Sequence, residues 1–353
     1  MPDQYPHFRT DAQLRAGVII WQIMCPVLLI LGTFGNVLSI IVLARPRFRR
    51  WASTVYLIGL SIADLCVLYI GLLRQWFRYT FNNDVRELSS TLCKVHWWLM
   101  YCAADSSVWI LVAITLERLV STLCPYRSKQ LCSRRVSTIT VAVIVPTAMI
   151  VNSHLMYGFD RFEIKSGNTT ILVPCAPATE SYDIFFEKVW NWLDLCKFSL
   201  IPFIILSVGN ACILYKLIQS RRKVKSQVLP ATSEGSSTQR KNTTSNMSVL
   251  LVALNFMFIL STLPVAIYFL GDPYWIPEDI PRHVKLQDPW WAFVNLLYYI
   301  NNSSNFILYC LTGSRFRESV KSLFLFRKIH NSFVGSGNTI QTSNIWDKYK
   351  SCC

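Results

Sequence analysis

The sequence is poor in charged residues and lacks the cysteine patterns of metal and redox proteins. Only 16% of its 353 residues are charged, whereas 52% are hydrophobic. A soluble protein carries nearer a quarter charged residues, so the composition indicates an integral membrane protein. The 12 cysteines follow no zinc-ligand spacing and form no CxxC pair, which argues against a zinc or redox protein.

Further absences narrow the class of membrane protein. Residues 1–16 are polar, and the first apolar run, 17–44, is too long for a signal-peptide core, so we expect an uncleaved first span. The apolar runs show neither internal repeats nor a continuous chain of polar residues. A seven-span transporter or channel, which stays the alternative class, would be expected to carry one of these features.

Seven apolar segments are each long enough to cross a bilayer, which takes about 20 mainly apolar residues. They lie at about 17–44, 52–79, 90–123, 136–158, 190–219, 246–270 and 288–311. The sequence therefore predicts an all-α membrane protein, a seven-transmembrane helix bundle.

Basic residues gather on one side of these segments. The connections rich in Lys and Arg are 45–50, 118–135, 216–245 and 313–329, whereas 80–89, 159–189 and 271–287 hold few. This asymmetry places the basic connections in the cytoplasm and the N-terminus, residues 1–16, outside the cell. It explains the net charge of +15 without nucleic acid. We expect a multi-pass protein of the plasma membrane.

Three features lie outside the spans. Residues 313–329 carry an apolar and a basic face, which predicts an amphipathic helix on the inner membrane surface. Residues 330–353 are predicted to be a disordered tail, and its final Cys352-Cys353 pair is open to lipidation or remains free. Asn168 begins a sequon in the longest outer connection and is a candidate glycosylation site.

A charged residue lies near the middle of the second segment. Asp64 there costs about 2.5 to 3.5 kcal/mol on insertion scales. One structural hydrogen bond would satisfy it, but we favour a cluster of polar side chains from other segments: Asn36, Ser107, Asn301 and Asn305. Such an oxygen-rich cluster suits a sodium ion or a proton, and no other cofactor is expected.

The third segment has a functional candidate at each end. Cys93 at the outer end and Cys175 in the outer connection both face an oxidising compartment, so we expect a disulfide worth about 2 to 4 kcal/mol. Glu117-Arg118 stands at the inner end. The plain interpretation is a snorkelling arginine. The specific hypothesis pairs Arg118 with Glu117 at rest and releases it when the helices part.

Together these residues resemble the rhodopsin-like (class A) G-protein-coupled receptor family. The pieces that match, in chain order, are Gly35-Asn36, Leu60-Ser61-Ile62-Ala63-Asp64, Cys93 with Cys175, Glu117-Arg118-Leu119, Pro202, Phe258 with Pro264, and Asn305-Phe306-Ile307-Leu308-Tyr309. The resemblance implies a receptor rather than an enzyme. It also implies a heterotrimeric G protein, arrestin, a receptor kinase and membrane lipid as partners.

The resemblance implies roles for residues of the inner half. The implied switch for the G protein comprises Glu117, Arg118, Asn305 and Tyr309. The implied pivots for an outward movement of the sixth segment are Pro202, Phe258 and Pro264. The chain departs from the family pattern at Thr262 (usually Trp), Phe306 (usually Pro) and Asn210 (usually Tyr). Such divergence resembles invertebrate neuropeptide receptors, including those for FMRFamide-like peptides.

The ligand class follows from further comparison with this family. Met100 stands where monoamine receptors carry an aspartate, which disfavours an amine, and span 288–311 has no lysine, which excludes an opsin. The outer connections are relatively acidic and aromatic, which favours an extracellular peptide with basic and apolar groups. A non-peptide small molecule is the alternative ligand. The ligand-binding candidates are Arg74, Trp97, Met100, Asp194, Tyr268 and Trp291.

Overall fold

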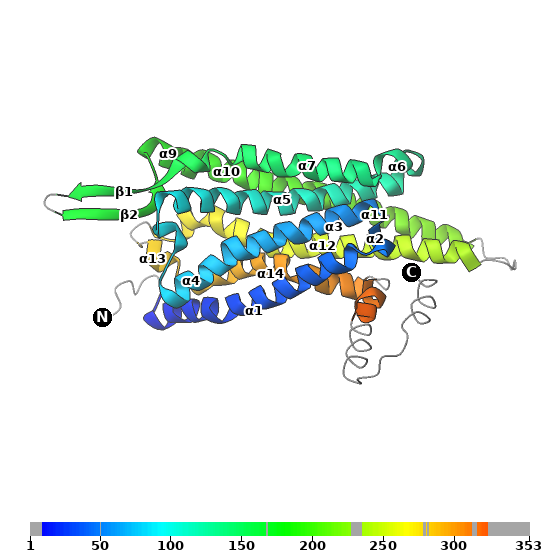
Figure 1. Ribbon diagram of the computed structural model, residues 1–353, viewed down its shortest axis with the longest axis horizontal. Coiled ribbons are helices and arrows are strands. Elements are labelled where there is room, and N and C mark those ends of the chain that lie inside the picture. The colour runs from blue at the N-terminus through cyan, green and yellow to red at the C-terminus, as the bar shows by residue number, and fades with distance from the viewer. Residues whose placement is uncertain are drawn as a thin grey trace, which may run out of the picture.

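The computed structural model describes residues 9–49, 51–166, 169–226, 235–277, 280, 282–312 and 316–323. Its long helices run side by side along one axis (Figure 1). A two-stranded antiparallel hairpin, β1 (Phe159–Ser166) with β2 (Thr169–Pro177), projects from one end, which we call the hairpin end. The opposite end, where α2 (Pro46–Arg49) and α6 (Pro125–Leu131) lie, is called the basic end.

Seven helical paths make up the bundle. They are α1 (Asp11–Leu43), α3 (Ala52–Val67) continued by α4 (Leu73–Phe81), α5 (Ser90–Leu123), α7 (Arg134–Val151), α11 (Ile201–Ser226), α12 (Gly235–Trp275) and α14 (Pro289–Thr312). Short helices between them are η2 (Val85–Glu87), α8 (Leu155–Gly158), α9 (Glu180–Phe185), α10 (Asn191–Asp194) and α13 (Arg282–Lys285). The predicted all-α bundle is confirmed.

Within the described residues, six helices are long and apolar enough to cross a membrane. The seventh path, α14, is less apolar because residues 301–305 read Asn-Asn-Ser-Ser-Asn. It nevertheless lies within the bundle, packed against α1 and α12. Its polar side chains therefore face other helices, as expected where lipid offers no hydrogen-bond partners.

Side-chain caps explain where several helices begin. Thr10 and Gln13 form a capping box at the start of α1. Three further caps accept a bond from the backbone N–H three residues on: Ser89 before α5, Ser133 before α7 and Thr179 before α9. Each cap stabilises its helix by about 1 kcal/mol. At the end of α4, Asn82 adopts φ 51°, a left-handed conformation that asparagine tolerates, and the chain turns towards α5.

Two of the helical paths contain π-helical turns. The turn η1 (Leu68–Leu72) joins α3 to α4. The turns η3 (Phe186–Trp190) and η4 (Leu195–Leu200) interrupt the path from α9 through α10 to α11. The last of these ends two residues before Pro202, which has no N–H to donate to the preceding turn. A π-helical turn accommodates one extra residue and is often found at functional sites.

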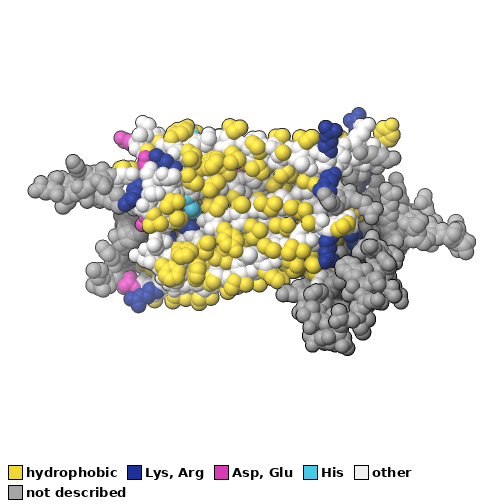
Figure 2. All heavy atoms as spheres, in the orientation of Figure 1, with side chains coloured by type: hydrophobic (Ala, Val, Ile, Leu, Met, Phe, Trp, Pro, Cys, Tyr) yellow, Lys and Arg dark blue, Asp and Glu magenta, His cyan; other side chains and the backbone are white. Residues whose placement is uncertain are grey.

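The bundle is apolar both inside and on its lateral surface. One interior cluster surrounds Ile110 and Phe258, and another surrounds Trp21 and Leu68. Figure 2 shows hydrophobic side chains covering the middle of the visible face, with charged side chains near the two ends. Many large hydrophobic side chains of the helices are exposed, among them Ile30, which is 69% exposed. So large an apolar surface is expected to contact lipid, which supports a multi-pass membrane protein.

The predicted amphipathic helix is described in part, over residues 316–323, which are helical. Phe316 is buried and its ring contacts those of Phe48 and Tyr309. Arg45 fixes the same segment, because its Nη1 donates to the Ser322 hydroxyl at 2.8 Å. Several predictions lie outside the described residues: Asn168, the rest of 313–329, and the tail 330–353 with Cys352 and Cys353.

Candidate functional site

The disulfide at the hairpin end joins β2 to the first turn of α5. Cys93 and Cys175 are bonded with their Cα atoms 5.4 Å apart, which confirms the predicted bridge. Cys93 is fully buried and packs with Leu155 and Phe159. Because the bridge spans 82 residues of sequence, it holds the hairpin against the end of the bundle.

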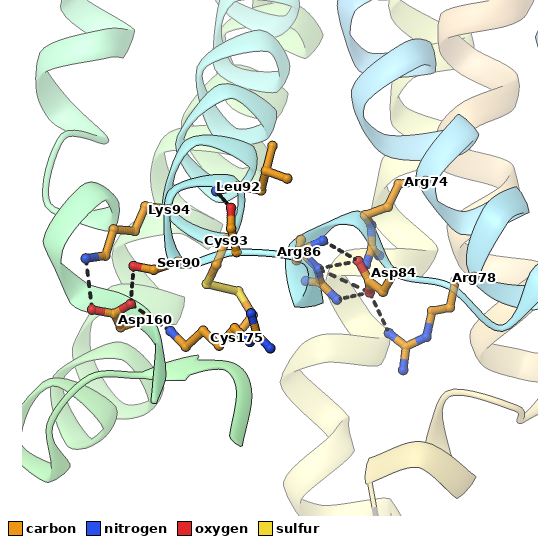
Figure 3. The surroundings of a disulfide bond; sticks show 12 residues. Arg74, Arg78, Asp84, Arg86, Ser90, Leu92, Cys93, Lys94, Asp160 and Cys175 are labelled. Atoms are coloured by element: carbon orange, nitrogen blue, oxygen red, sulfur yellow. Dashed lines mark hydrogen bonds and ion pairs between the residues drawn. A yellow bond between two sulfur atoms is a disulfide. The ribbon is translucent and has the colours of Figure 1, made fainter. Parts of the chain in front are cut away.

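Beside the disulfide, three arginines surround one buried carboxylate (Figure 3). Oδ2 of Asp84 lies 2.6 Å from Arg74 Nη1, 2.8 Å from Arg86 Nη2 and 3.6 Å from Arg78 Nη1. Burial opposes ionisation of Asp84, but the hydrogen bonds from Arg86 and the charge of Arg74 outweigh it and hold its pKa far below the usual range. Arg74, a predicted ligand contact, thus forms an ion pair with Asp84.

A second acidic residue of the hairpin end is also paired. Asp160 accepts a hydrogen bond from the Ser90 hydroxyl and lies 2.9 Å from Lys94 Nζ. These two contacts lower the pKa of Asp160. The acidic outer connections predicted a cationic ligand, yet the carboxylates of Asp84 and Asp160 are neutralised by cations of the chain itself. Neither is available as a free acceptor for a ligand.

The aromatic ligand candidates fall into two groups. Trp97 stacks on Phe159 with ring centroids 4.8 Å apart, so it belongs to the wall formed by α5 and the hairpin. Tyr268 on α12 contacts Trp291 on α14 at 5.8 Å, on a different pair of helices. Met100 packs with the cluster that includes Trp291. The structure brings Tyr268 and Trp291 together but places Trp97 with the disulfide-linked hairpin.

An ion cluster that the sequence interpretation missed connects three helices. Lys197 Nζ lies 2.7 Å from Asp105 Oδ2 and 2.7 Å from Asp194 Oδ1. Asn152, after α7, donates to Asp105 Oδ2 at 2.7 Å. Of these residues only Asp194 was a predicted contact. The sequence does contain a sign of this cluster, because Asp105 and Lys197 are charged residues inside apolar segments. Charged residues inside a membrane are expected to pair. The two carboxylates and one ammonium leave a net charge of −1.

The predicted polar cluster around Asp64 is assembled from three helices. Ser107 donates to Oδ1 at 2.8 Å, and Asn305 donates to Oδ2 at 2.6 Å. Asn302, which was not predicted, donates to Oδ1 at 2.8 Å. The predicted Asn301 instead lines a small cavity next to the cluster, together with Ser107 and Asn305.

Asn36 completes this cluster through the backbone of α14. Its Nδ2 donates to the carbonyl of Asn302 at 2.9 Å. Among the described residues, two buried oxygens of this cluster accept no hydrogen bond: Asn36 Oδ1 and Asn302 Oδ1. Buried acceptors without a donor favour a bound cation or water, and an oxygen-only set suits a hard cation.

At the basic end, Glu117 and Arg118 meet through a serine of α3. The Ser53 hydroxyl donates to Glu117 at 3.0 and 3.1 Å and accepts from Arg118 Nη2. In the described chain no ion pair joins Glu117 to Arg118 directly, so the arrangement differs from the expected neighbour pair. Arg118 is only 8% exposed. Arg118 of α5 is therefore bonded to Ser53 of α3. Asn305, another residue of the predicted switch, instead donates a hydrogen bond to Asp64.

A second polar connection holds α12 to its neighbours. Asn255 on α12 donates through Nδ2 to the Thr115 hydroxyl of α5 at 3.0 Å and to Asn210 Oδ1 of α11 at 2.9 Å. Asn255 and Thr115 are fully buried. We call these three residues the asparagine clasp. Phe258, a predicted pivot, lies one turn further along α12 and is 1% exposed.

The fold and these sites define a membrane protein built as a bundle of seven helical paths. Comparison with known proteins agrees: the 7 transmembrane receptor (rhodopsin family) matches residues 35–309. The chain belongs to this family, which consists of receptors rather than enzymes, as the sequence predicts.

Individual relatives are distant. A probable G-protein coupled receptor of Caenorhabditis elegans is 25% identical over 323 residues, which cover 89% of this chain and 71% of that protein. Galanin receptor 2a of Danio rerio is 23% identical, with 87% and 78% covered. The FMRFamide receptor of Drosophila melanogaster is 22% identical, with 85% and 53% covered. These names include neuropeptide receptors, as the sequence interpretation expected.

Replacing either bridged cysteine is expected to destabilise the protein. Cys93→Ser and Cys175→Ser each release the hairpin from α5, which costs about 2 to 5 kcal/mol for a native disulfide. Surface labelling of intact cells and the thermal midpoint of purified protein should both fall. Cys66→Ser, which changes an exposed free cysteine, is the matched control. Equal values for all variants would contradict a structural role of the bridge.

Proposed function

We propose that this chain is a plasma-membrane receptor for an extracellular peptide and that it activates a heterotrimeric G protein. In this proposal the hairpin end faces outside and the basic end faces the cytoplasm, as the distribution of Lys and Arg favours. The observation that carries the proposal is that one helix, α5, is tied to the hairpin at Cys93 and holds a buried arginine, Arg118, at its other end. Arrestin, a receptor kinase and membrane lipid are proposed as further partners.

The proposed ligand site lies between the hairpin end and the ion cluster. Asp194 and Lys197 supply charged groups, while Trp97, Tyr268 and Trp291 supply aromatic faces. Arg74 and Met100, from the second and third spans, are also proposed as contacts. The net negative charge of the ion cluster favours a ligand that carries a basic group. A peptide fits this mixture of charged and aromatic partners better than a small apolar molecule does.

Activation is proposed to move α12 outwards, with Pro202, Phe258 and Pro264 as pivots. Because Asn255 is buried and bonded to both α5 and α11, that movement must break the asparagine clasp. Leaving a buried polar group without its partner costs about 1 to 3 kcal/mol. The clasp thus stabilises the resting state, and the ligand must supply the difference in affinity between the two states. Release of Arg118 from Ser53 and Glu117 would then present it to the G protein. Tyr309 is proposed as a further residue of this switch.

The cluster around Asp64 is proposed to hold a sodium ion in the resting state. Asp64, Ser107, Asn301, Asn305 and Asn36 are the proposed residues of this site. A bound sodium ion would supply positive charge that balances the Asp64 carboxylate. When α14 shifts, the donors Asn302 and Asn305 move relative to α3, so affinity for the ion would differ between the two states.

A peptide screen tests the function as a whole. Cells expressing the chain are exposed to a neuropeptide library, with calcium and cyclic AMP as readouts, and active peptides are tested for nucleotide exchange. Arg118→Ala should abolish peptide-stimulated exchange because it removes the guanidinium group that is proposed to contact the G protein. Arg15→Ala, an exposed arginine on α1, serves as the control. Full exchange in Arg118→Ala at equal surface expression would refute the switch.

Weakening the asparagine clasp should raise basal exchange without any ligand. In Thr115→Val the hydroxyl that binds Asn255 is lost at nearly constant volume. A loss of about 1 kcal/mol would shift the resting-to-active ratio about fivefold. Thr140→Val on α7 is the matched control, because its hydroxyl bonds to the carbonyl of Val136 in its own helix. Basal exchange equal in both variants would show that the clasp does not restrain α12.

Sodium should lower agonist potency in the wild type, because the ion stabilises the resting state. Asp64→Asn removes the charge that the ion balances and should abolish this effect. Dose–response curves in sodium chloride and choline chloride measure it. Asp11→Asn at the start of α1 is the control. Sodium sensitivity that persists in Asp64→Asn would place the ion elsewhere.

A further inference from the structure

The three arginines around Asp84 carry more charge than their partner neutralises. Arg74, Arg78 and Arg86, which we call the arginine triad, share the single carboxylate of Asp84. In the described chain, every ion pair that these arginines make goes to Asp84. Glu87, on the same short helix as Arg86, is exposed and makes no ion pair with them. The group therefore carries a net charge of +2.

This surplus charge lies where it is poorly screened. The side chains of Arg74, Arg86 and Arg78 are only 9%, 14% and 25% exposed, and that of Asp84 is 2% exposed. The positive charges of these arginines therefore repel one another more strongly than they would in bulk water, because their buried surroundings have a lower dielectric constant. One arginine is enough to balance the charge of the Asp84 carboxylate, so the other two cations call for another explanation.

The surroundings of the triad favour an oxyanion. Oδ2 of Asp84 receives contacts from all three arginines, and within the described residues the guanidinium of Arg78 donates no hydrogen bond to the chain. The guanidinium of Arg86 also lies 5.1 Å from the ring centroid of Trp97, so one side of the site is an aromatic wall. A planar guanidinium binds carboxylate or sulfate through paired hydrogen bonds.

We propose that the arginine triad binds an acidic group of the extracellular ligand, a carboxylate or a sulfate. This inference rests on the proposed function of the chain as a peptide receptor. The acidic group approaches Arg78 and Arg86, the more exposed members, and Asp84 keeps their guanidinium groups in place. The triad and the Asp105–Lys197–Asp194 cluster then form two regions of opposite net charge. The ligand that fits both carries an acidic group and a basic group at separate positions.

One experiment tests the triad without any agonist. Purified full-length receptor is heated in sodium sulfate and in sodium chloride of equal ionic strength, and the thermal midpoints are compared. Sulfate stabilises proteins in general by exclusion from their surface, and that part is common to all variants. In the wild type and in the exposed-arginine control Arg15→Gln, sulfate is expected to raise the thermal midpoint by more than this general effect. The additional rise should fall by about half or more in Arg78→Gln and Arg86→Gln. The same rise in all four proteins would overturn anion binding at the triad.

A second experiment asks whether the anion belongs to the ligand. Each active peptide from the screen is made with every Asp, Glu and C-terminal carboxylate neutralised in turn, as Asn, Gln or amide. In the wild type, one of these changes should reduce potency by about tenfold, which corresponds to about 1.4 kcal/mol. In Arg78→Gln, whose contact to Asp84 is the longest, the same change should have little effect.

The two proposals fail in different ways. A screen without any active peptide would count against the peptide receptor, while the sulfate comparison still decides whether the triad binds an anion. Active peptides whose potency is indifferent to their acidic groups in the wild type would overturn the triad as a ligand site. The receptor function would stand in that case. If neutralising the acidic group of the peptide reduced potency equally in the wild type and in Arg78→Gln, the acidic group would bind elsewhere. That result would also overturn the triad as a ligand site.

Discussion

The structure depends on one constraint: inside a bilayer, a polar side chain must find its partner within the protein, on its own helix or on another, because the lipid offers none. Helix α5 meets this requirement repeatedly. Its Asp105 pairs with Lys197, its Ser107 donates to Asp64, and its Thr115 bonds to Asn255. Each contact joins α5 to a different helical path. Displacing one path therefore disturbs contacts that share a single central helix.

The sequence alone predicted the bundle, the disulfide and most partners of Asp64. Apolar length, charge asymmetry and compartment chemistry are local properties that the sequence states directly. The arginine triad, the ion cluster of Lys197 and the asparagine clasp were not predicted. Which side chains meet depends on how each helix is rotated about its axis, and a single sequence does not give that rotation. Asn301 and Asn302 illustrate the limit, since adjacent asparagines on α14 face different partners.

The hairpin end also shows that the number of acidic residues does not predict the charge that a ligand meets. Counting acidic residues there suggested attraction for cations, yet Asp84 and Asp160 are neutralised by arginine and lysine of the chain. What a ligand meets is the charge that remains after internal pairing. That remainder is positive beside the disulfide and negative in the ion cluster that Asp105 of α5 forms with Lys197 and Asp194. Recognition therefore depends on the position of charge more than on its total.

The π-helical turn between α3 and α4 has a consequence for how such a protein can change over time. One extra residue in a helix rotates everything beyond it by about 100° relative to an unbroken helix. Arg74 lies beyond η1, whereas Asp64 lies before it. Gain or loss of one residue at this turn would present a new set of side chains to the ligand and leave the inner contacts in register. Such a helix lets the side chains at the hairpin end diverge among descendants while the contacts towards the basic end are inherited intact.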